Sequence, residues 1–173
     1  DIVEVTDFAP TPLLNTEIQT KISGGANVQM FDMNDYHTFV VFDDGSVIGT
    51  GSNSNGELGL GDTTSHLYDI VDISIVDVVS VYIAGVASSV FFITTDGSVY
   101  CNGVNTNGEL GIGSTSSPIT SPTQAIVSNV KTVTSNANFG TFFLTNDGEV
   151  YACGKNVESG SNFTMSRLGD GTE

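Results

Sequence analysis

The chain has 173 residues, of which 39% are hydrophobic and 14% are charged, a globular composition that excludes a disordered chain and a coiled coil. Its 20 acidic and 4 basic residues give a formal net charge of −16, which excludes a nucleic-acid-binding surface and disfavours an anionic membrane surface. No apolar run approaches the ~18 residues that a spanning helix needs, so we expect no membrane insertion.

Runs of β-branched and aromatic residues predict nine strands, three in each of three similar segments, and no stretch has helical periodicity. In chain order these strands are Val28–Phe31, Thr38–Phe42 and Ser46–Thr50, then Val78–Ile83, Val90–Thr94 and Ser98–Asn102, then Val130–Thr134, Thr141–Leu144 and Glu149–Cys153. The glycine-rich stretch after each third strand predicts turns where backbones pass closely.

The three segments are copies of one repeat. The step from Asp44 to Asp96 is 52 residues, and the step from Asp96 to Asp147 is 51. The same two steps relate the positions that we interpret as structural: Asp44, Gly45, Gly51 and Asn53, then Asp96, Gly97, Gly103 and Asn105, then Asp147, Gly148, Gly154 and Asn156. Steps this constant at so many positions do not arise by chance, so the chain is a repeat protein.

Each Asp-Gly pair favours a two-residue hairpin, because both residues tolerate a positive φ. The acidic positions Asp43, Asp44, Asp62 and Asp170 also suggest calcium, but no repeat contains the Asp-x-Asp-x-Asp-Gly ladder, and we favour the hairpin. The Asn-x-Asn-Gly-Glu segments, Asn53–Glu57 and Asn105–Glu109, are interpreted as turns whose asparagines bond neighbouring backbone groups.

Four-stranded units of about 50 residues are typical of β-propeller blades. We therefore predict an all-β fold of antiparallel four-stranded blades, forming a partial propeller of about three blades. Residues 1–25 are expected to complete the preceding blade, and the repeats to cover 26–77, 78–128 and 129–173, the third truncated and with an insertion at 157–167. An open arc leaves two blade faces without a neighbour. Either the chain is a piece of a longer protein, or several copies complete a ring or stack into an array.

The repeats resemble those of the regulator of chromosome condensation family. The second repeat fits the family pattern best, at Asp96, Gly97, Val99, Tyr100, Gly103, Asn105, Gly108, Leu110, Gly111 and Gly113. The resemblance covers roughly residues 28–172 and implies a seven-bladed propeller. The family usually has tryptophan before the glycine that follows the third strand, whereas this chain has Thr50, Asn102 and Cys153. We expect this diverged member to fill the space between its blades differently.

The sequence contains no recognisable catalytic, cofactor or metal site. His37 is expected to bond backbone groups at the start of a strand, and His66 to lie in a solvated loop. Neither histidine has a second ligand at metal-binding spacing. The chain also lacks a nucleophile elbow, a Walker loop and a dinucleotide-binding fingerprint. We therefore predict a protein that is not an enzyme and binds no cofactor.

Cys101 follows its Asp-Gly aspartate by five residues, whereas Cys153 follows its own by six. Because strand side chains alternate, we expect the two sulfurs to point to opposite faces and to remain free and buried. A bridge to another chain is left open. Asn162, in the sequon Asn162-Phe163-Thr164, is a candidate glycosylation site if the protein is secreted.

We predict a scaffold that binds another protein or further copies of itself. The lysine-poor, acidic composition suggests an extracellular or cell-surface protein, for example an appendage or fibre component. The chain begins at Asp1 without a basic and apolar leader, so either a signal peptide was removed or more sequence precedes it. The resemblance implies one alternative, guanine-nucleotide exchange on a small GTPase. A second alternative is a secreted protein inhibitor, because a bacterial β-lactamase inhibitor protein shares this type of propeller.

Overall fold

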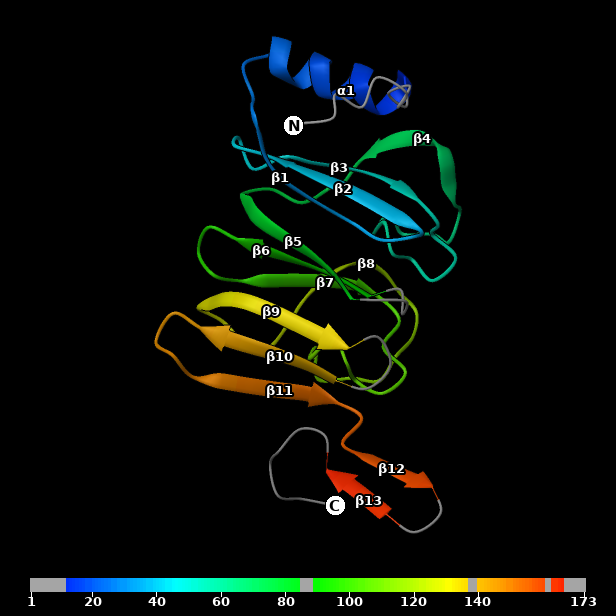
Figure 1. Ribbon diagram of the computed structural model, residues 1–173, viewed down its shortest axis with the longest axis vertical. Coiled ribbons are helices and arrows are strands. Elements are labelled where there is room, and N and C mark those ends of the chain that lie inside the picture. The colour runs from blue at the N-terminus through cyan, green and yellow to red at the C-terminus, as the bar shows by residue number, and fades with distance from the viewer. Residues whose placement is uncertain (1–11, 85–88, 137–139, 161–162, 167–173) are drawn as a thin grey trace, which may run out of the picture.

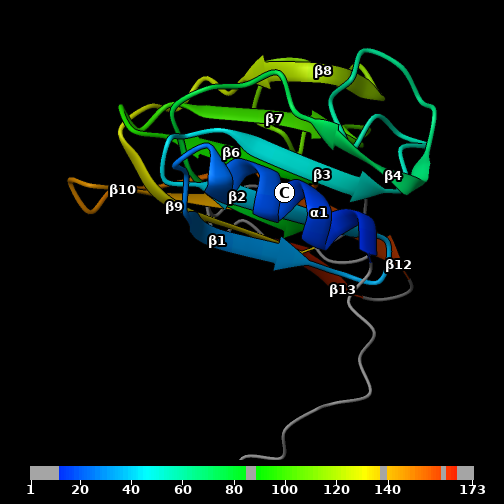
Figure 2. The ribbon, with the colours of Figure 1, turned by 90° about the horizontal axis from the view of Figure 1, so that it is seen from above.

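The computed structural model describes residues 12–84, 89–136, 140–160 and 163–166. Three antiparallel sheets follow one another along the molecule, with a helix at the N-terminal end and a hairpin at the C-terminal end (Figure 1). The sheets fan out rather than lying flat on one another, as the view from above shows (Figure 2). The structure is the predicted open, partial propeller, and it is nearly all-β.

Each sheet is one blade and lies within one predicted repeat. Blade 1 consists of β1 (Val28–Met33), β2 (His37–Phe42), β3 (Val47–Gly51) and β4 (His66–Asp72), in that order across the sheet. Blade 2 has the same order, with β5 (Val78–Ala84), β6 (Ser89–Thr94), β7 (Val99–Gly103) and β8 (Ile119–Gln124). Blade 3 contains β9 (Val130–Asn136), β10 (Gly140–Thr145) and β11 (Val150–Gly154).

The third sheet departs from the expected four strands. Among the described residues it has three, and β12 (Val157–Gly160) pairs with β13 (Phe163–Ser166) in a separate hairpin. This hairpin lies in the predicted insertion. Within the described ranges, β11 therefore pairs along one edge, with β10.

The prediction that helical periodicity is absent is wrong for one segment, because α1 (Pro12–Ser23) forms within the lead-in residues. The helix ends in a Schellman motif: the N–H of Ala26 donates to the carbonyl of Lys21, and that of Gly25 to Ile22. Gly25 has a φ of 101°, which this motif requires. Ile18 packs on the cluster around Phe42, so tertiary contact supports a segment of modest helix propensity.

Side chains of each blade alternate between two faces. The front face looks toward the next blade in the chain and the back face toward the preceding element. On β2, Phe39 and Val41 belong to the front face. Phe39 meets Phe92 of the blade 2 back face edge to face, with ring centroids 5.6 Å apart. The same contact recurs one blade later, where Phe91 meets Phe143 at 6.0 Å. The hydrophobic core is thus divided into two inter-blade layers and a third cluster between α1 and blade 1.

The inner strands β1, β5 and β9 neighbour one another and tie the blades together. Asp32 of β1 accepts a hydrogen bond from the N–H of Ile83 at 2.9 Å. Tyr82, which takes the position of Asp32 in blade 2, donates its hydroxyl to the carbonyl of Ser135 at 3.0 Å. Two different side chains therefore form the hydrogen bond between inner strands at successive inter-blade interfaces.

Candidate functional site

The predicted Asp-Gly turns close the hairpins of all three blades. Asp44 and Asp96 each accept a backbone hydrogen bond at 2.9 Å, from Ser46 and Ser98 respectively. Ser46, whose backbone N–H donates to Asp44, and the hydroxyl of Thr94, which donates to Asp96, hold the pKa of the two carboxyl groups below the usual range. The carboxylate oxygens of Asp44 and Asp96 therefore accept hydrogen bonds within the hairpin turns. In the described part of the chain, no three potential metal-ligating side chains gather into one site.

The hairpin glycines of blades 1 and 2 also contact the linker that leads into the next blade. A Cβ at Gly45 would lie 2.7 Å from the Cα of Asp77, and one at Gly97 would lie 2.8 Å from the Cα of Asn129. Asp77 and Asn129 have positive φ values of 58° and 57°, so both linkers make the same bend. Gly148, at the equivalent position of blade 3, has no described atom within 4 Å of its would-be Cβ.

The predicted asparagine turns follow each complete blade's third strand. Asn53 and Asn105 are fully buried. Each accepts the N–H of a leucine five residues on, Leu58 at 2.8 Å and Leu110 at 2.9 Å. Their side-chain amides donate to the loop backbone, so these asparagines fix the turn. In blade 3, Asn156 stands just before β12, where the repeat departs from the other two.

Gly51, Gly103 and Gly154 end β3, β7 and β11 with positive φ values of 126°, 104° and 111°. The residue before each is the one that replaces the family's tryptophan. Asn102 donates to the carbonyls of Gly56 and Glu57 in the preceding blade, at 2.9 and 2.6 Å. Cys153 makes the equivalent contact, with Sγ 3.3 Å from the carbonyl of Glu109. Small side chains at these positions of blades 2 and 3 thus bond to the loop of the preceding blade.

The sequence did not reveal a buried pair formed by His37 and Glu57. Their side chains are 2% and 1% exposed, and Nε2 of the ring lies 3.7 Å from Oε1 of the carboxylate. Burial opposes ionisation of Glu57, but the facing imidazole and the hydrogen bonds from Asn55 outweigh it and lower the pKa to about 2. The other ring nitrogen lies 3.1 Å from Oδ1 of Asn34, so the ring contacts side chains and not the expected backbone groups. Ser89 occupies the place of His37 in the second repeat, so no repeated pattern indicated the pair.

The two cysteines are free, as predicted, but the expectation that their faces keep them apart is wrong. Cys101 lies on the front face of blade 2 and Cys153 on the back face of blade 3, and opposite faces of consecutive blades look at each other. Both thiols belong to the same inter-blade cluster and contact consecutive carbonyls, those of Leu110 and Glu109. Burial raises the pKa of both, that of Cys153 to about 12.

The two ends of the blade stack expose apolar side chains. On the back face of blade 1, Phe31 is 65% and Met33 is 62% exposed, because α1 covers the part of that face formed by β2–β4. Their counterparts in blade 2, Val81 and Ile83, are 3% and 6% exposed against blade 1. On the front face of blade 3, Val150 is 64% exposed, whereas Val99 is fully buried in blade 2.

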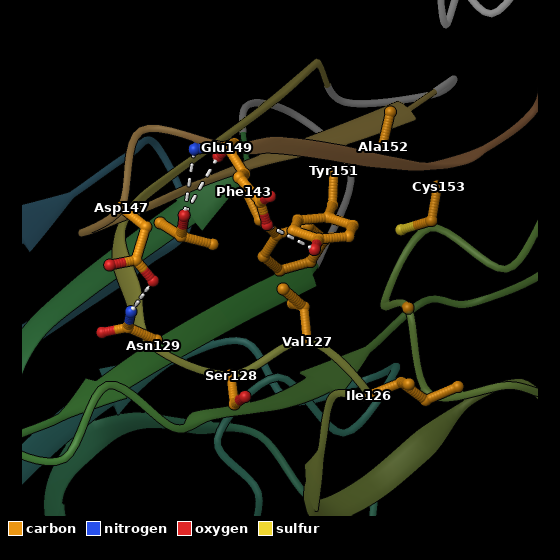
Figure 3. A pocket seen from close by; sticks show the side chains of 12 residues that line it. Ile126, Val127, Ser128, Asn129, Phe143, Asp147, Glu149, Tyr151, Ala152 and Cys153 are labelled. Carbon is orange, nitrogen blue, oxygen red and sulfur yellow. Dashed lines mark hydrogen bonds between the residues drawn. The ribbon is translucent and has the colours of Figure 1, made fainter.

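A groove of about 420 Å³ lies between the segment after β8 and the back face of blade 3. Figure 3 shows Tyr151 and Val127 in its walls and Asp147 and Glu149 at one end. A groove of similar volume, about 410 Å³, occurs at the same place between blades 1 and 2, where Tyr100 corresponds to Tyr151. Its lining includes Pro122 from β8, a strand with no described counterpart in blade 3.

Residues 31–57 match the family model described as Regulator of chromosome condensation (RCC1) repeat. This stretch of the chain is similar to an RCC1 repeat, and the chain is similar to RCC1-type propellers in fold. The fold of human WBSCR16 is similar, with a TM-score of 0.67, 20% identity and coverage of 82% of this chain and 37% of that one. Yeast RCC1 (Prp20), solved bound to Kap60, gives a TM-score of 0.62 at 20% identity over 75% of this chain and 30% of that one.

A second structure, Prp20p from Saccharomyces cerevisiae, was described with its binding properties to Gsp1p and histones. It has a TM-score of 0.60 and 20% identity, and the match covers 75% of this chain and 31% of that one. The chain therefore spans between 30% and 37% of the length of the chains in these three structures. Within the described residues, no helix is long and apolar enough to cross a membrane. Asn162, the candidate glycosylation site, lies outside the described residues.

Proposed function

We propose that this chain is a non-catalytic protein-binding scaffold that contacts its partners through the exposed faces of its first and last blades. The supporting observation is the contrast between Phe31 and Met33, both more than 60% exposed, and their buried counterparts Val81 and Ile83. Faces of this kind pair twice within the chain, and each pairing buries a phenylalanine cluster. The proteins named with yeast RCC1 and Prp20p, namely Kap60, Gsp1p and histones, agree with a protein-binding role.

Further copies of the chain are the simplest partner. The front face of blade 3 and the back face of blade 1 both expose apolar side chains, and front and back faces already pack together twice within the chain. A head-to-tail contact would repeat the intramolecular one and would generate a ring or an array. The net charge of −16 opposes close approach of copies, so we expect assembly to strengthen with salt. The acidic composition also supports the proposed extracellular or cell-surface setting.

Sedimentation velocity tests this proposal. We expect the wild-type chain to sediment faster than an 18.1 kDa particle, increasingly so with concentration. The double variant Phe31→Asp, Met33→Asp should sediment as a monomer, because each new carboxylate would have to lose its water in the contact. Val76→Asp is the matched control, since Val76 is 72% exposed but lies in the linker between blades 1 and 2. A wild-type chain that is monomeric at every concentration and salt would refute self-assembly.

Nucleotide exchange on a small GTPase is the second candidate, favoured by the similarity to Prp20p and its described binding to Gsp1p. A nucleotide-release assay with GTPases loaded with a fluorescent guanine nucleotide distinguishes the two functions. Accelerated release would support exchange, whereas an unchanged rate together with assembly would support the scaffold.

A further inference from the structure

The hydrogen bonds around His37 fix the position of one proton on its ring. Oδ1 of Asn34 accepts the backbone N–H groups of Tyr36 and His37 at 2.9 and 2.8 Å, so this atom is the oxygen of the side-chain amide and not its nitrogen. The same oxygen lies 3.1 Å from Nδ1 of the imidazole. Because an acceptor requires a donor, Nδ1 carries a proton. In a neutral ring the second nitrogen, Nε2, would then have only a lone pair.

The group that faces Nε2 is a carboxylate that acts as an acceptor through both of its oxygens. Oε2 of Glu57 accepts the backbone N–H of Asn55 at 2.8 Å, and Oε1 accepts its side-chain amide at 3.0 Å. Nε2 of His37 lies 3.7 Å from Oε1 and makes no hydrogen bond among the described residues. A lone pair on this buried nitrogen would face a negative charge, whereas an N–H would face an acceptor. The arrangement therefore favours a ring with a proton on both nitrogens.

The other titratable groups around the ring do not replace Glu57. Among the described residues, Glu57 supplies the only carboxylate within ion-pair distance of His37. Asp32 of β1 accepts the N–H of Ile83, and Asp35 is exposed to solvent. The ring of Tyr36 meets the imidazole edge to face, with centroids 6.4 Å apart. The charge that the imidazole faces is thus that of Glu57.

Glu57 belongs to the loop of residues 53–58, which packs blade 1 onto blade 2. Its carbonyl accepts the side-chain amide of Asn102 of blade 2 at 2.6 Å. The next residue, Leu58, is fully buried in the hydrophobic cluster between the two blades. The contact with His37 therefore holds in place a loop that forms part of the inter-blade interface.

The corresponding loop of blade 2 packs in the same way without an imidazole. Ser89 stands at the position of His37, and its hydroxyl donates to the carbonyl of Val104 at 2.9 Å. Leu110, the counterpart of Leu58, is fully buried between blades 2 and 3, and its N–H also donates to an asparagine side chain. The chain thus contains a matched loop that lacks the titratable ring.

We propose that His37 and Glu57 form a pH-sensitive latch between blades 1 and 2. With a proton on both ring nitrogens, the pair holds the loop of residues 53–58 against blade 2. Loss of the Nε2 proton leaves a buried carboxylate facing a lone pair, and the loop opens so that water can reach both groups. The latch is closed at mildly acidic pH and opens more often as the pH rises. This inference goes beyond the scaffold function and does not depend on the partner that the scaffold binds.

Amide hydrogen exchange on the wild-type protein tests the latch, with the second loop as an internal control. After correction for the intrinsic pH dependence of exchange, the amide of Leu58 reports how often its loop opens. Above about pH 6.5, where an exposed imidazole loses its proton, the opening constant should rise by up to about tenfold per pH unit, because opening releases one proton. The amide of Leu110 should show no such rise.

Two variants assign the effect to the ring. His37→Ser, which introduces the residue that blade 2 has at this position, should abolish the rise at Leu58. His66→Ser is the matched control, because His66 is the other histidine of the chain and begins β4, and it should leave the rise unchanged.

Nitrogen-15 NMR of the wild-type ring gives a second measurement that does not depend on how the variants fold. Both nitrogens of His37 should carry protons at mildly acidic pH, and Nε2 rather than Nδ1 should lose its proton as the pH rises. Loss of the Nδ1 proton first would overturn the proposal. So would an opening constant at Leu58 that is constant or falls with rising pH, an equal rise at Leu110, or an unchanged rise in His37→Ser.

Discussion

The three hairpin glycines offer a matched series that separates backbone strain from crowding between blades. Gly97→Ala and Gly148→Ala both place a side chain at a positive φ, 76° and 84° respectively. This strain costs about 1 kcal/mol in each variant. Only Gly97 would also drive its Cβ to 2.8 Å from the Cα of Asn129, so the linker into blade 3 must move. Forcing extra volume into a packed contact costs about 1–3 kcal/mol.

We therefore expect Gly97→Ala to lower the free energy of unfolding by about 2–4 kcal/mol and Gly148→Ala by about 1 kcal/mol. Gly45→Ala should behave like Gly97→Ala, since its Cβ would lie 2.7 Å from the Cα of Asp77. Urea unfolding followed by far-UV circular dichroism measures the difference, because the chain has no tryptophan to report on folding. Equal losses for Gly97→Ala and Gly148→Ala, with unchanged m values, would refute the claim that the linker contact restricts these positions.

Three further outcomes follow from buried polar groups. Glu57→Gln should destabilise the chain by about 3 kcal/mol near pH 7, because a pKa lowered from 4.5 to about 2 stabilises the fold above pH 4.5 and this contribution disappears as the pH falls toward 2. In thermal melts, Glu57→Gln should converge with wild type only at low pH, whereas the exposed control Glu17→Gln should match wild type at every pH. Asn102→Ala should lower the free energy of unfolding by about 1–3 kcal/mol, since two buried carbonyls lose their donor, and urea titration against wild type would show no change if the contact is dispensable. Cys153, with its pKa raised to about 12, should react with iodoacetamide far more slowly in the folded protein than in urea; similar rates in both would contradict its place between the blades.

The repeat and its turns were predictable because they depend on local chemistry. A positive φ at the second hairpin position requires glycine, so the Asp-Gly pairs marked the hairpins at Asp44, Asp96 and Asp147 in the structure as well. Runs of β-branched and aromatic residues then predicted the strands, and the repeat length of about 50 residues predicted four-stranded blades. The helix α1 also left a signal, since Leu14, Ile18 and Ile22 recur every four residues ahead of Gly24 and Gly25. Poor helix formers such as Asn15 and Thr16 weaken that pattern, and packing on blade 1 supplies the rest.

The parts of the candidate site that were missed depend on contacts between repeats. His37 and Glu57 are 20 residues apart in sequence and meet only after β2 and β3 have formed their hairpin. The two cysteines were assigned to opposite faces correctly. The sequence did not show that the front face of blade 2 lies against the back face of blade 3, so it did not predict that the two thiols share one inter-blade layer. The groove at Gly111 likewise lies between two repeats, and a groove of similar volume occurs between blades 1 and 2.

The helix at the N-terminal end gives the molecule an order of assembly during synthesis. Residues 12–23 leave the ribosome before the strands of blade 1, so Ile18 is available to cover Phe42 as soon as blade 1 closes. Each later linker then docks on a hairpin glycine that is already in place, at Gly45 and then at Gly97. Each new blade is therefore added to the same side of the preceding one. A truncated product that retains α1 and blade 1 keeps a first blade on which the helix is packed.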